Sequence, residues 1–159
     1  MWGRPRLTSD IDVTVRLGDL SLNALIEQLG RQGFEVRVPP TPDFLQRTRV
    51  VPLRHQPSGL DVDVVLAGPG LEDEFLARAI SVSIGGSLIP VISAEDLIVT
   101  KVLAGRAKDL EDVGGVLSAQ GGRLSLGTVR RTLAILESAL GQSDLLPAFE
   151  AEVAKIQSR

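Results

Sequence analysis

The hydrophobic periodicity changes near residue 92, and this change constrains the fold more than any other feature of the 159-residue chain. Before that point, short runs of alternating or β-branched residues, which are typical of strands, are mixed with helical segments. After it, apolar residues recur at helical spacing. The layout predicts an α+β fold, with a small mixed or antiparallel sheet and flanking helices over residues 1–92. A C-terminal helical part over residues 93–159 is expected to pack on it as a single compact unit.

The expected elements follow from these patterns and from turn and capping residues. Strands are predicted over residues 10–15, 34–37, 49–55, 60–66, 80–84 and 87–92, the last two joined by a Gly-Gly hairpin turn. Helices are predicted over residues 21–32, 70–79, 94–104, 108–119, 127–140 and 144–157. Residues 93–96 (Ser-Ala-Glu-Asp) resemble a capping box, and Gly105 is expected to break or bend the helix that follows.

The composition excludes several classes of site. The chain has no cysteine and one histidine, so disulfides, zinc–thiolate sites, iron–sulfur clusters, cysteine catalysis and multi-histidine metal sites are ruled out. Seventeen basic and twenty acidic side chains give a net charge of −3, so the total charge does not indicate a basic nucleic-acid-binding surface. We expect no membrane span and no signal peptide, and therefore a cytoplasmic protein whose chemistry uses carboxylates, Lys, Arg, Ser and Thr.

Two predicted strands carry aspartates at alternate positions: Asp10 and Asp12 in one, Asp61 and Asp63 in the other. Alternate residues of a strand share a face, so each pair points to one side. Like charges at this spacing repel, and Mg²⁺ or Mn²⁺ would resolve the repulsion. If the strands are neighbours, three or four carboxylates converge and can hold metal ions for in-line phosphoryl chemistry. The alternative is that each strand has one solvated face.

A mixed-charge segment over residues 101–112 is the third signal. On an unbroken helix, Lys101, Lys108 and Asp112 fall within about 40° of each other. Arg106 would then lie in the apolar stripe, which argues for a bend or for a buried partner of its guanidinium. Close to a carboxylate–metal centre, such cations would hold a nucleotide phosphate. The alternative is a solvated face with salt bridges between its own charges.

Taken together, four segments resemble the DNA polymerase beta-like nucleotidyltransferases, in the order and rough spacing of that superfamily: residues 6–13, 62–65, 93–101 and 106–113. Within the superfamily, they most resemble the small abortive-infection, type IV toxin–antitoxin nucleotidyltransferases, and the resemblance covers nearly the whole chain. It implies that Asp10, Asp12 and Asp63 bind Mg²⁺ and act in catalysis. Asp61 is then a substitute for Asp63 or an outer-shell group.

The resemblance also implies the groups that meet the nucleotide and the reaction they serve. The family's lysine on the helix after the sheet corresponds to Lys101, and its Arg-x-Lys-Asp stretch corresponds to residues 106–109, which include Lys108. Apart from the resemblance, Thr8 precedes the acidic pair, and its hydroxyl can donate a hydrogen bond to a phosphate; the alternative is that it belongs to the turn at the start of the strand. The implied reaction is transfer of a nucleoside monophosphate from a nucleoside triphosphate (NTP) to a hydroxyl of RNA, such as a tRNA end, or of a protein. A toxin role with an antitoxin partner is also implied.

The sequence departs from the family pattern at its start. The family has a Gly-Ser or Gly-Gly turn before its Asp-x-Asp pair, preceded by a helix, and this turn cradles the triphosphate. Nine residues precede Asp10 here, and they lack the motif. Either the start is truncated or this member has lost the phosphate cradle, so the alternative function is a non-catalytic protein of this fold that binds a partner or a nucleotide. One face of the sheet is also expected to be incompletely covered, which leaves an apolar patch.

Overall fold

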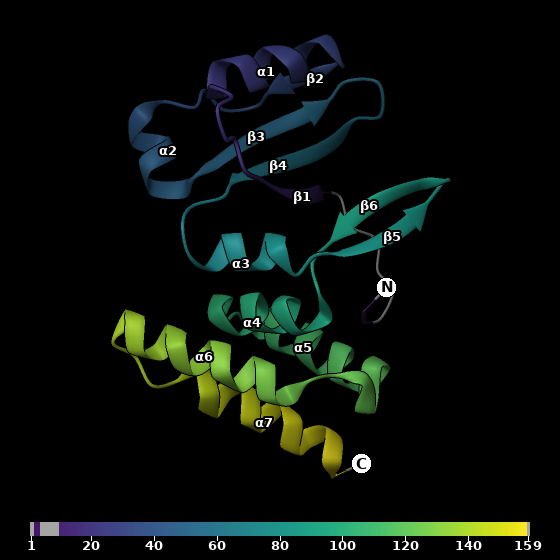
Figure 1. Ribbon diagram of the computed structural model, residues 1–159, viewed down its shortest axis with the longest axis vertical. Helices are drawn as coiled ribbons and strands as arrows, with labels where there is room; N and C mark the ends of the chain where they lie inside the picture. Colours follow the sequence, from purple (N-terminus) through teal and green to yellow (C-terminus); the bar gives the residue numbers. More distant parts are fainter. Residues whose placement is uncertain (1, 4–9, 159) are drawn as a thin grey trace. The chain divides into compact units, whose positions relative to one another are not determined.

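The computed structural model describes residues 2–3 and 10–158 of the chain (Figure 1). It divides into two compact units, each described here by itself: a sheet unit of residues 7–77, and a helical unit of residues 1–6 with 78–159. Both helices and a mixed sheet are present, so the predicted α+β class is confirmed. The predicted division near residue 92, and the packing of the two parts on each other, stay predictions.

The sheet unit is built on a four-stranded sheet, counted over residues 10–77, with the order β1-β4-β3-β2. Its strands are β1 (Asp10–Val15), β2 (Phe34–Val36), β3 (Val50–His55) and β4 (Leu60–Leu66). Strand β1 runs parallel to β4, whereas β3 is antiparallel to both β4 and β2. The same unit contains the helices α1 (Leu22–Arg31), α2 (Pro42–Thr48) and α3 (Leu71–Ala77). The order makes β1 and β4 direct neighbours, although they are far apart in the sequence.

Helix α1 covers the apolar face of this sheet. Ser21 begins the helix, and its hydroxyl accepts a hydrogen bond from the backbone N–H of Ala24. The apolar side chains of α1 recur at helical spacing and pack on the buried strand residues Val51, Leu53, Val62 and Val64. On β1, by contrast, Ile11 and Val13 are 47% and 39% exposed. These two apolar side chains lie on β1, at one edge of the sheet, and the predicted apolar patch stays a prediction.

Helix α2 was not among the expected elements. Thr41 caps it, with its hydroxyl accepting a hydrogen bond from the N–H of Phe44 at 3.3 Å, and Pro42 lies in the first turn. Arg49 ends the helix in the left-handed conformation, with φ of +54°. A threonine followed by a proline is a recognised signal for a helix start, and the sequence interpretation overlooked it.

Over residues 78–158, the helical unit contains a hairpin followed by helices: β5 (Ile80–Ile84), β6 (Ser87–Val91), α4 (Ala94–Ala104), α5 (Ala107–Gln120), a 3₁₀ turn (Gly121–Arg123), α6 (Leu126–Leu140) and α7 (Leu145–Gln157). Gly85 and Gly86 both have positive φ and form the predicted two-residue turn of the hairpin. In the part of the chain that the structure describes, none of the helices is long and apolar enough to span a bilayer.

The predicted start of α4 is confirmed, but the expected capping box takes another form. The Ser93 hydroxyl accepts a hydrogen bond from the N–H of Asp96 at 3.0 Å. The Asp96 carboxylate, which is buried, accepts hydrogen bonds from Arg78 Nη2 at 2.8 Å and Nε at 3.1 Å. This bidentate pair compensates the buried charge and joins Arg78, which precedes β5, to α4.

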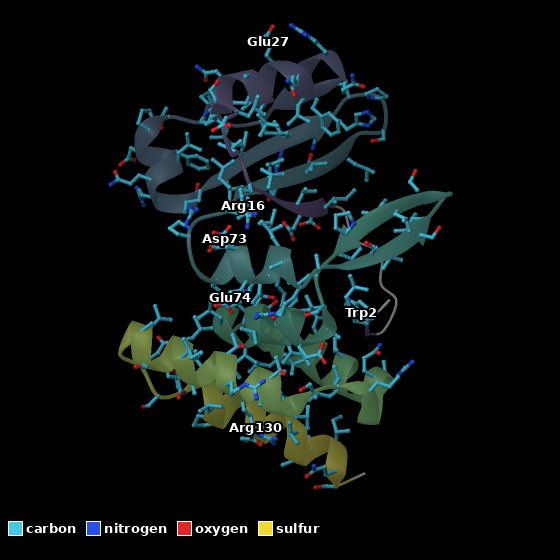
Figure 2. The ribbon with its side chains drawn as sticks, in the orientation of Figure 1. Trp2, Arg16, Glu27, Asp73, Glu74 and Arg130 are labelled. Carbon is cyan, nitrogen blue, oxygen red and sulfur yellow. The ribbon has the colours of Figure 1, made fainter. Side chains whose placement is uncertain are left out.

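Trp2 is anchored in the helical unit (Figure 2). Its indole Nε1 donates a hydrogen bond to the carbonyl of Ile92 at 2.8 Å, and Gln120 Nε2 donates to the carbonyl of Trp2 at 3.0 Å. The chain has one tryptophan and no tyrosine. The fluorescence of Trp2 is therefore an intrinsic probe of this unit.

Candidate functional site

The two aspartate pairs meet on the polar face of the sheet unit. The register of β1 and β4 sets Asp10 beside Asp61 and Asp12 beside Asp63. Neighbouring strands lie about 4.8 Å apart, and residues paired in this way point to the same side of a sheet. Val62 and Val64, which alternate with the β4 aspartates, belong to the opposite face, which α1 covers. The neighbouring strands on which the predicted convergence depends are therefore present.

Two arginines on the same face bind the β4 aspartates. Arg37 follows β2 and donates from Nη2 to Asp63 Oδ1 at 2.5 Å, while its Nη1 lies 3.4 Å from Asp61 Oδ2. Arg54, on β3, donates from Nε to Asp61 Oδ1 at 2.8 Å. The hydrogen bond from Arg54 lowers the pKa of the Asp61 carboxyl, and the Asp61 carboxylate raises the pKa of Arg54.

The sequence interpretation missed both arginines. Each of them reaches its aspartate through strand pairing: Arg54 is directly opposite Asp61 in the antiparallel β3–β4 register. The local pattern offers a weak signal for this pair, because residues 56–59 form a turn between two strand-like runs and would place Arg54 opposite Asp61. No comparable local signal points from Arg37 to Asp63.

The donor set on this face suits a hard divalent cation, because carboxylate oxygens are the ligands that Mg²⁺ and Mn²⁺ prefer. Asp10 and Asp12 are exposed, and Asp61 and Asp63 are partly exposed. As the side chains stand, however, no three acidic or histidine side chains within residues 2–3 and 10–158 are arranged to hold a metal ion. Both β4 carboxylates bind guanidinium groups instead. Metal binding by Asp10, Asp12 and Asp63 therefore stays a prediction.

Lys101 lies in an ion cluster of the helical unit, which we call the α4–α5 ion cluster (Lys101, Arg106, Asp109 and Asp112). Lys101 Nζ lies 2.8 Å from Asp109 Oδ1 and 2.8 Å from Asp112 Oδ2. Arg106 donates from Nε to Asp109 Oδ2. The hydrogen bond from Arg106 is the main cause that lowers the pKa of Asp109 to about 2, and Lys101 adds to it against the effect of burial. Burial lowers the pKa of Lys101, but its hydrogen bonds to Asp109 and Asp112 outweigh this and raise it.

A break between α4 and α5 makes this cluster possible. Gly105 ends α4 in the left-handed conformation with φ of +64°, and Arg106 is the N-cap residue of α5. The predicted bend is thus confirmed, and the Arg106 side chain is 62% exposed, outside the apolar stripe. Lys108, on the first turn of α5, is exposed. The predicted roles of Lys101 and Lys108 toward a nucleotide stay predictions, and Thr8 lies outside the described residues.

Comparison with known families adds one finding. The family described as "Nucleotidyltransferase of unknown function (DUF6036)" matches residues 3–136. The matched region includes the whole sheet unit from β1 onward and the α4–α5 ion cluster, and it ends within α6. A comparison with curated proteins gives no match.

Proposed function

This chain belongs to a family of nucleotidyltransferases, and from that premise we propose that it transfers a nucleoside monophosphate from an NTP to an acceptor hydroxyl with a divalent cation, Mg²⁺ or Mn²⁺. The observation that carries the proposal is the register that sets Asp10 beside Asp61 and Asp12 beside Asp63. Carboxylates gathered in this way repel one another. A purely structural polar face would avoid this cost, since Thr or Lys suits such strand positions better than Asp.

We assign Asp10, Asp12 and Asp63 as metal ligands and catalytic residues. A cation bound there would offset the negative charge of the triphosphate and of the transition state. Asp63 would orient the acceptor hydroxyl and accept its proton. The acceptor oxygen then forms a bond to the α-phosphorus, the bond from that phosphorus to the bridging oxygen breaks, and pyrophosphate leaves.

The remaining assignments follow the resemblance described above and, for Thr8, its place before the acidic pair. Thr8, Lys101 and Lys108 are the proposed phosphate contacts, since hydroxyl and ammonium groups suit phosphate oxygens. Lys101 would share its ammonium with Asp109 and Asp112, whereas Lys108 is exposed. The acceptor we propose is RNA, including tRNA ends, or a protein side chain. The abortive-infection resemblance adds a toxin role that an antitoxin partner restrains.

A thermal-shift titration tests the site. Wild type and Asp12→Asn are titrated with Mn²⁺ or Mg²⁺, with and without each NTP. For wild type we expect metal with one NTP to raise Tm by roughly 5–10 °C at a ligand concentration near 100 times Kd, and we expect no shift for Asp12→Asn. Asp43→Asn, which alters an exposed aspartate paired with Arg47 on α2, should respond like wild type. Equal Tm shifts for wild type and Asp12→Asn would contradict metal binding at this site.

Transfer itself is measured with α-labelled NTPs and RNA or protein acceptors. We expect label in the acceptor with wild type and its loss with Asp12→Asn and Asp63→Asn. Label released as free nucleotide without incorporation would identify a phosphoesterase and contradict the transferase. Nucleotide binding without either product would contradict the transferase and support the alternative, a non-catalytic protein of this fold. Growth arrest on expression of wild type, but not of Asp12→Asn, is the outcome expected of a toxin.

A further inference from the structure

We propose that Arg37 exchanges partners: it holds Asp63 in the absence of metal, and it binds a nucleotide phosphate once the cation takes Asp63. The inference rests on the proposed function, and it adds a residue that both regulates metal entry and contacts substrate. It concerns the sheet unit alone.

Arg37 reaches across a strand to its partner. It follows β2, and β3 lies between β2 and β4, where Pro52 is the residue opposite Asp63. At a strand spacing of about 4.8 Å, the backbones of Arg37 and Asp63 are roughly 10 Å apart, and a long arginine side chain and the aspartate side chain bridge this distance together. Its backbone N–H donates to the carbonyl of Pro52 at 2.8 Å, and its Nε donates to the carbonyl of Leu53 at 3.0 Å. The Nε atom of the guanidinium is therefore held in place, and its two Nη atoms face Asp61 and Asp63.

This contact engages one oxygen, Oδ1, of the carboxylate that the cation would need. Arg37 Nη2 lies 2.5 Å from Asp63 Oδ1, and a lone pair engaged in a charge-assisted hydrogen bond of this length is not available to a metal ion. The lack of a ready metal-holding group among the described residues agrees with this arrangement. Arg37 is thus an internal counter-ion of the carboxylates, and a cation competes with it for Asp63.

The charges on this face allow the exchange. Asp63 and Asp61 each bind a guanidinium group, from Arg37 and Arg54 respectively. A divalent cation at Asp63 would supply the positive charge that Arg37 supplies now, and Asp63 then no longer needs Arg37. The Arg37 side chain is 32% exposed, so its guanidinium can turn without leaving a buried charge behind.

A phosphate is the natural second partner of the displaced guanidinium. Any phosphate oxygen that shares a cation with Asp63 lies within a few ångströms of it, and Arg37 Nη2 already lies at hydrogen-bond distance from Asp63. Guanidinium groups bind phosphate through two parallel hydrogen bonds, which an ammonium does not reproduce. Arg37 therefore favours a metal-bound nucleotide over the metal alone.

Mn²⁺ binding, followed by the electron paramagnetic resonance of free Mn²⁺, tests the exchange on the full chain. Arg37→Gln should bind Mn²⁺ alone roughly 5–10-fold more tightly than wild type, because the competing guanidinium is gone. The same variant should bind the Mn²⁺–NTP pair several-fold more weakly than wild type, because the phosphate contact is lost. A merely structural role of Arg37 would not produce effects of opposite sign.

Two controls separate exchange from general electrostatics. Arg31→Gln removes an exposed arginine paired with Glu27 on α1 and should match wild type in both measurements. Arg54→Gln removes the arginine bound to Asp61, and it should tighten Mn²⁺ binding less than Arg37→Gln does and leave NTP affinity unchanged. Equal tightening in Arg54→Gln and Arg37→Gln would overturn the inference.

Three further outcomes are decisive. The inference is wrong if Arg37→Gln binds Mn²⁺ no more tightly than wild type, or if it keeps wild-type affinity for the NTP pair. If Arg37→Gln does not fold, Arg37→Lys replaces it: we expect Mn²⁺ affinity near that of wild type with weaker NTP binding, and wild-type NTP binding would contradict the phosphate contact. Failure of the proposed function looks different, since wild type and every arginine variant would then bind no Mn²⁺.

Discussion

The sheet unit and the helical unit differ in how deeply their paired aspartates are buried. In the sheet unit, the side chains of Asp61 and Asp63 are 25% and 33% exposed and pair with arginines on an open face. In the helical unit, Asp96 and Asp109 are 1% and 0% exposed and are compensated from neighbouring segments. Breaking a buried pair leaves an uncompensated charge, whereas a partly exposed pair can exchange its partner for water or a ligand. The buried aspartates of the helical unit are therefore part of its framework, whereas the partly exposed aspartates of the sheet unit can exchange partners.

The hydrophobic cores of the two units also differ, and the helical unit has the larger one. Among the described residues, the sheet has a small buried cluster: Val51, Leu53, Val62 and Val64. The helical unit buries larger and more numerous side chains, including Ile98, Val99, Val102, Val113, Val129, Leu133 and Phe149. Arg130, labelled in Figure 2, adds a surface contact there by pairing with Glu150 and lying over the Phe149 ring. A large core supports the fixed ion cluster of this unit.

The sharpest test of this contrast is Asp109→Asn. The variant leaves Lys101 and Arg106 without their buried carboxylate, and we expect it to lower the free energy of unfolding by roughly 3 kcal/mol. Urea unfolding followed by Trp2 fluorescence measures the effect in the helical unit. Lys108→Gln, which changes an exposed neighbour on α5, should stay within about 0.5 kcal/mol of wild type. Unchanged stability of Asp109→Asn would show that the cluster is not part of the framework.

The difference in unfolding free energy between wild type and Asp109→Asn should become smaller at low pH. The folded-state pKa of Asp109 is lowered to about 2 from 3.8, so its stabilisation is complete above about pH 4 and is lost as the pH falls toward 2. The gap between wild type and Asp109→Asn should therefore close by roughly half or more between pH 6 and pH 2.5. The same fluorescence unfolding at several pH values measures it. A gap that is independent of pH over this range would mean that packing, and not charge, causes the cost.

The smallest expected effect has the opposite sign and lies in the sheet unit. Asp10→Asn removes one of the mutually repelling carboxylates of β1 and β4, so in metal-free buffer it should raise stability by about 0.5 kcal/mol, or Tm by roughly 1–2 °C. Differential scanning calorimetry measures the shift, with Asp43→Asn as the surface control. A lower Tm for Asp10→Asn would place this aspartate with the structural charges and break the contrast between the units.

Much of the fold was readable from local patterns. The two-residue period of strands and the 3.6-residue period of helices located the elements that the structure contains, apart from α2 and the 3₁₀ turn. Capping chemistry located the start of α4 at Ser93, and the backbone freedom of Gly105 located its end. The period of two also required Asp10 with Asp12, and Asp61 with Asp63, to share a face whatever the rest of the chain does.

What the sequence determined by itself was therefore local: the elements, their polar and apolar faces, and the aspartate pairs. Only the tertiary structure decided which faces meet. The pairing of β1 with β4 brings the aspartate pairs together, and the order β4-β3-β2 brings Arg37 to Asp63. The break at Gly105 commits Lys101 to Asp109. Such contacts join residues that are distant in sequence or separated by a turn, and they depend on strand order, register and burial, which no local period encodes.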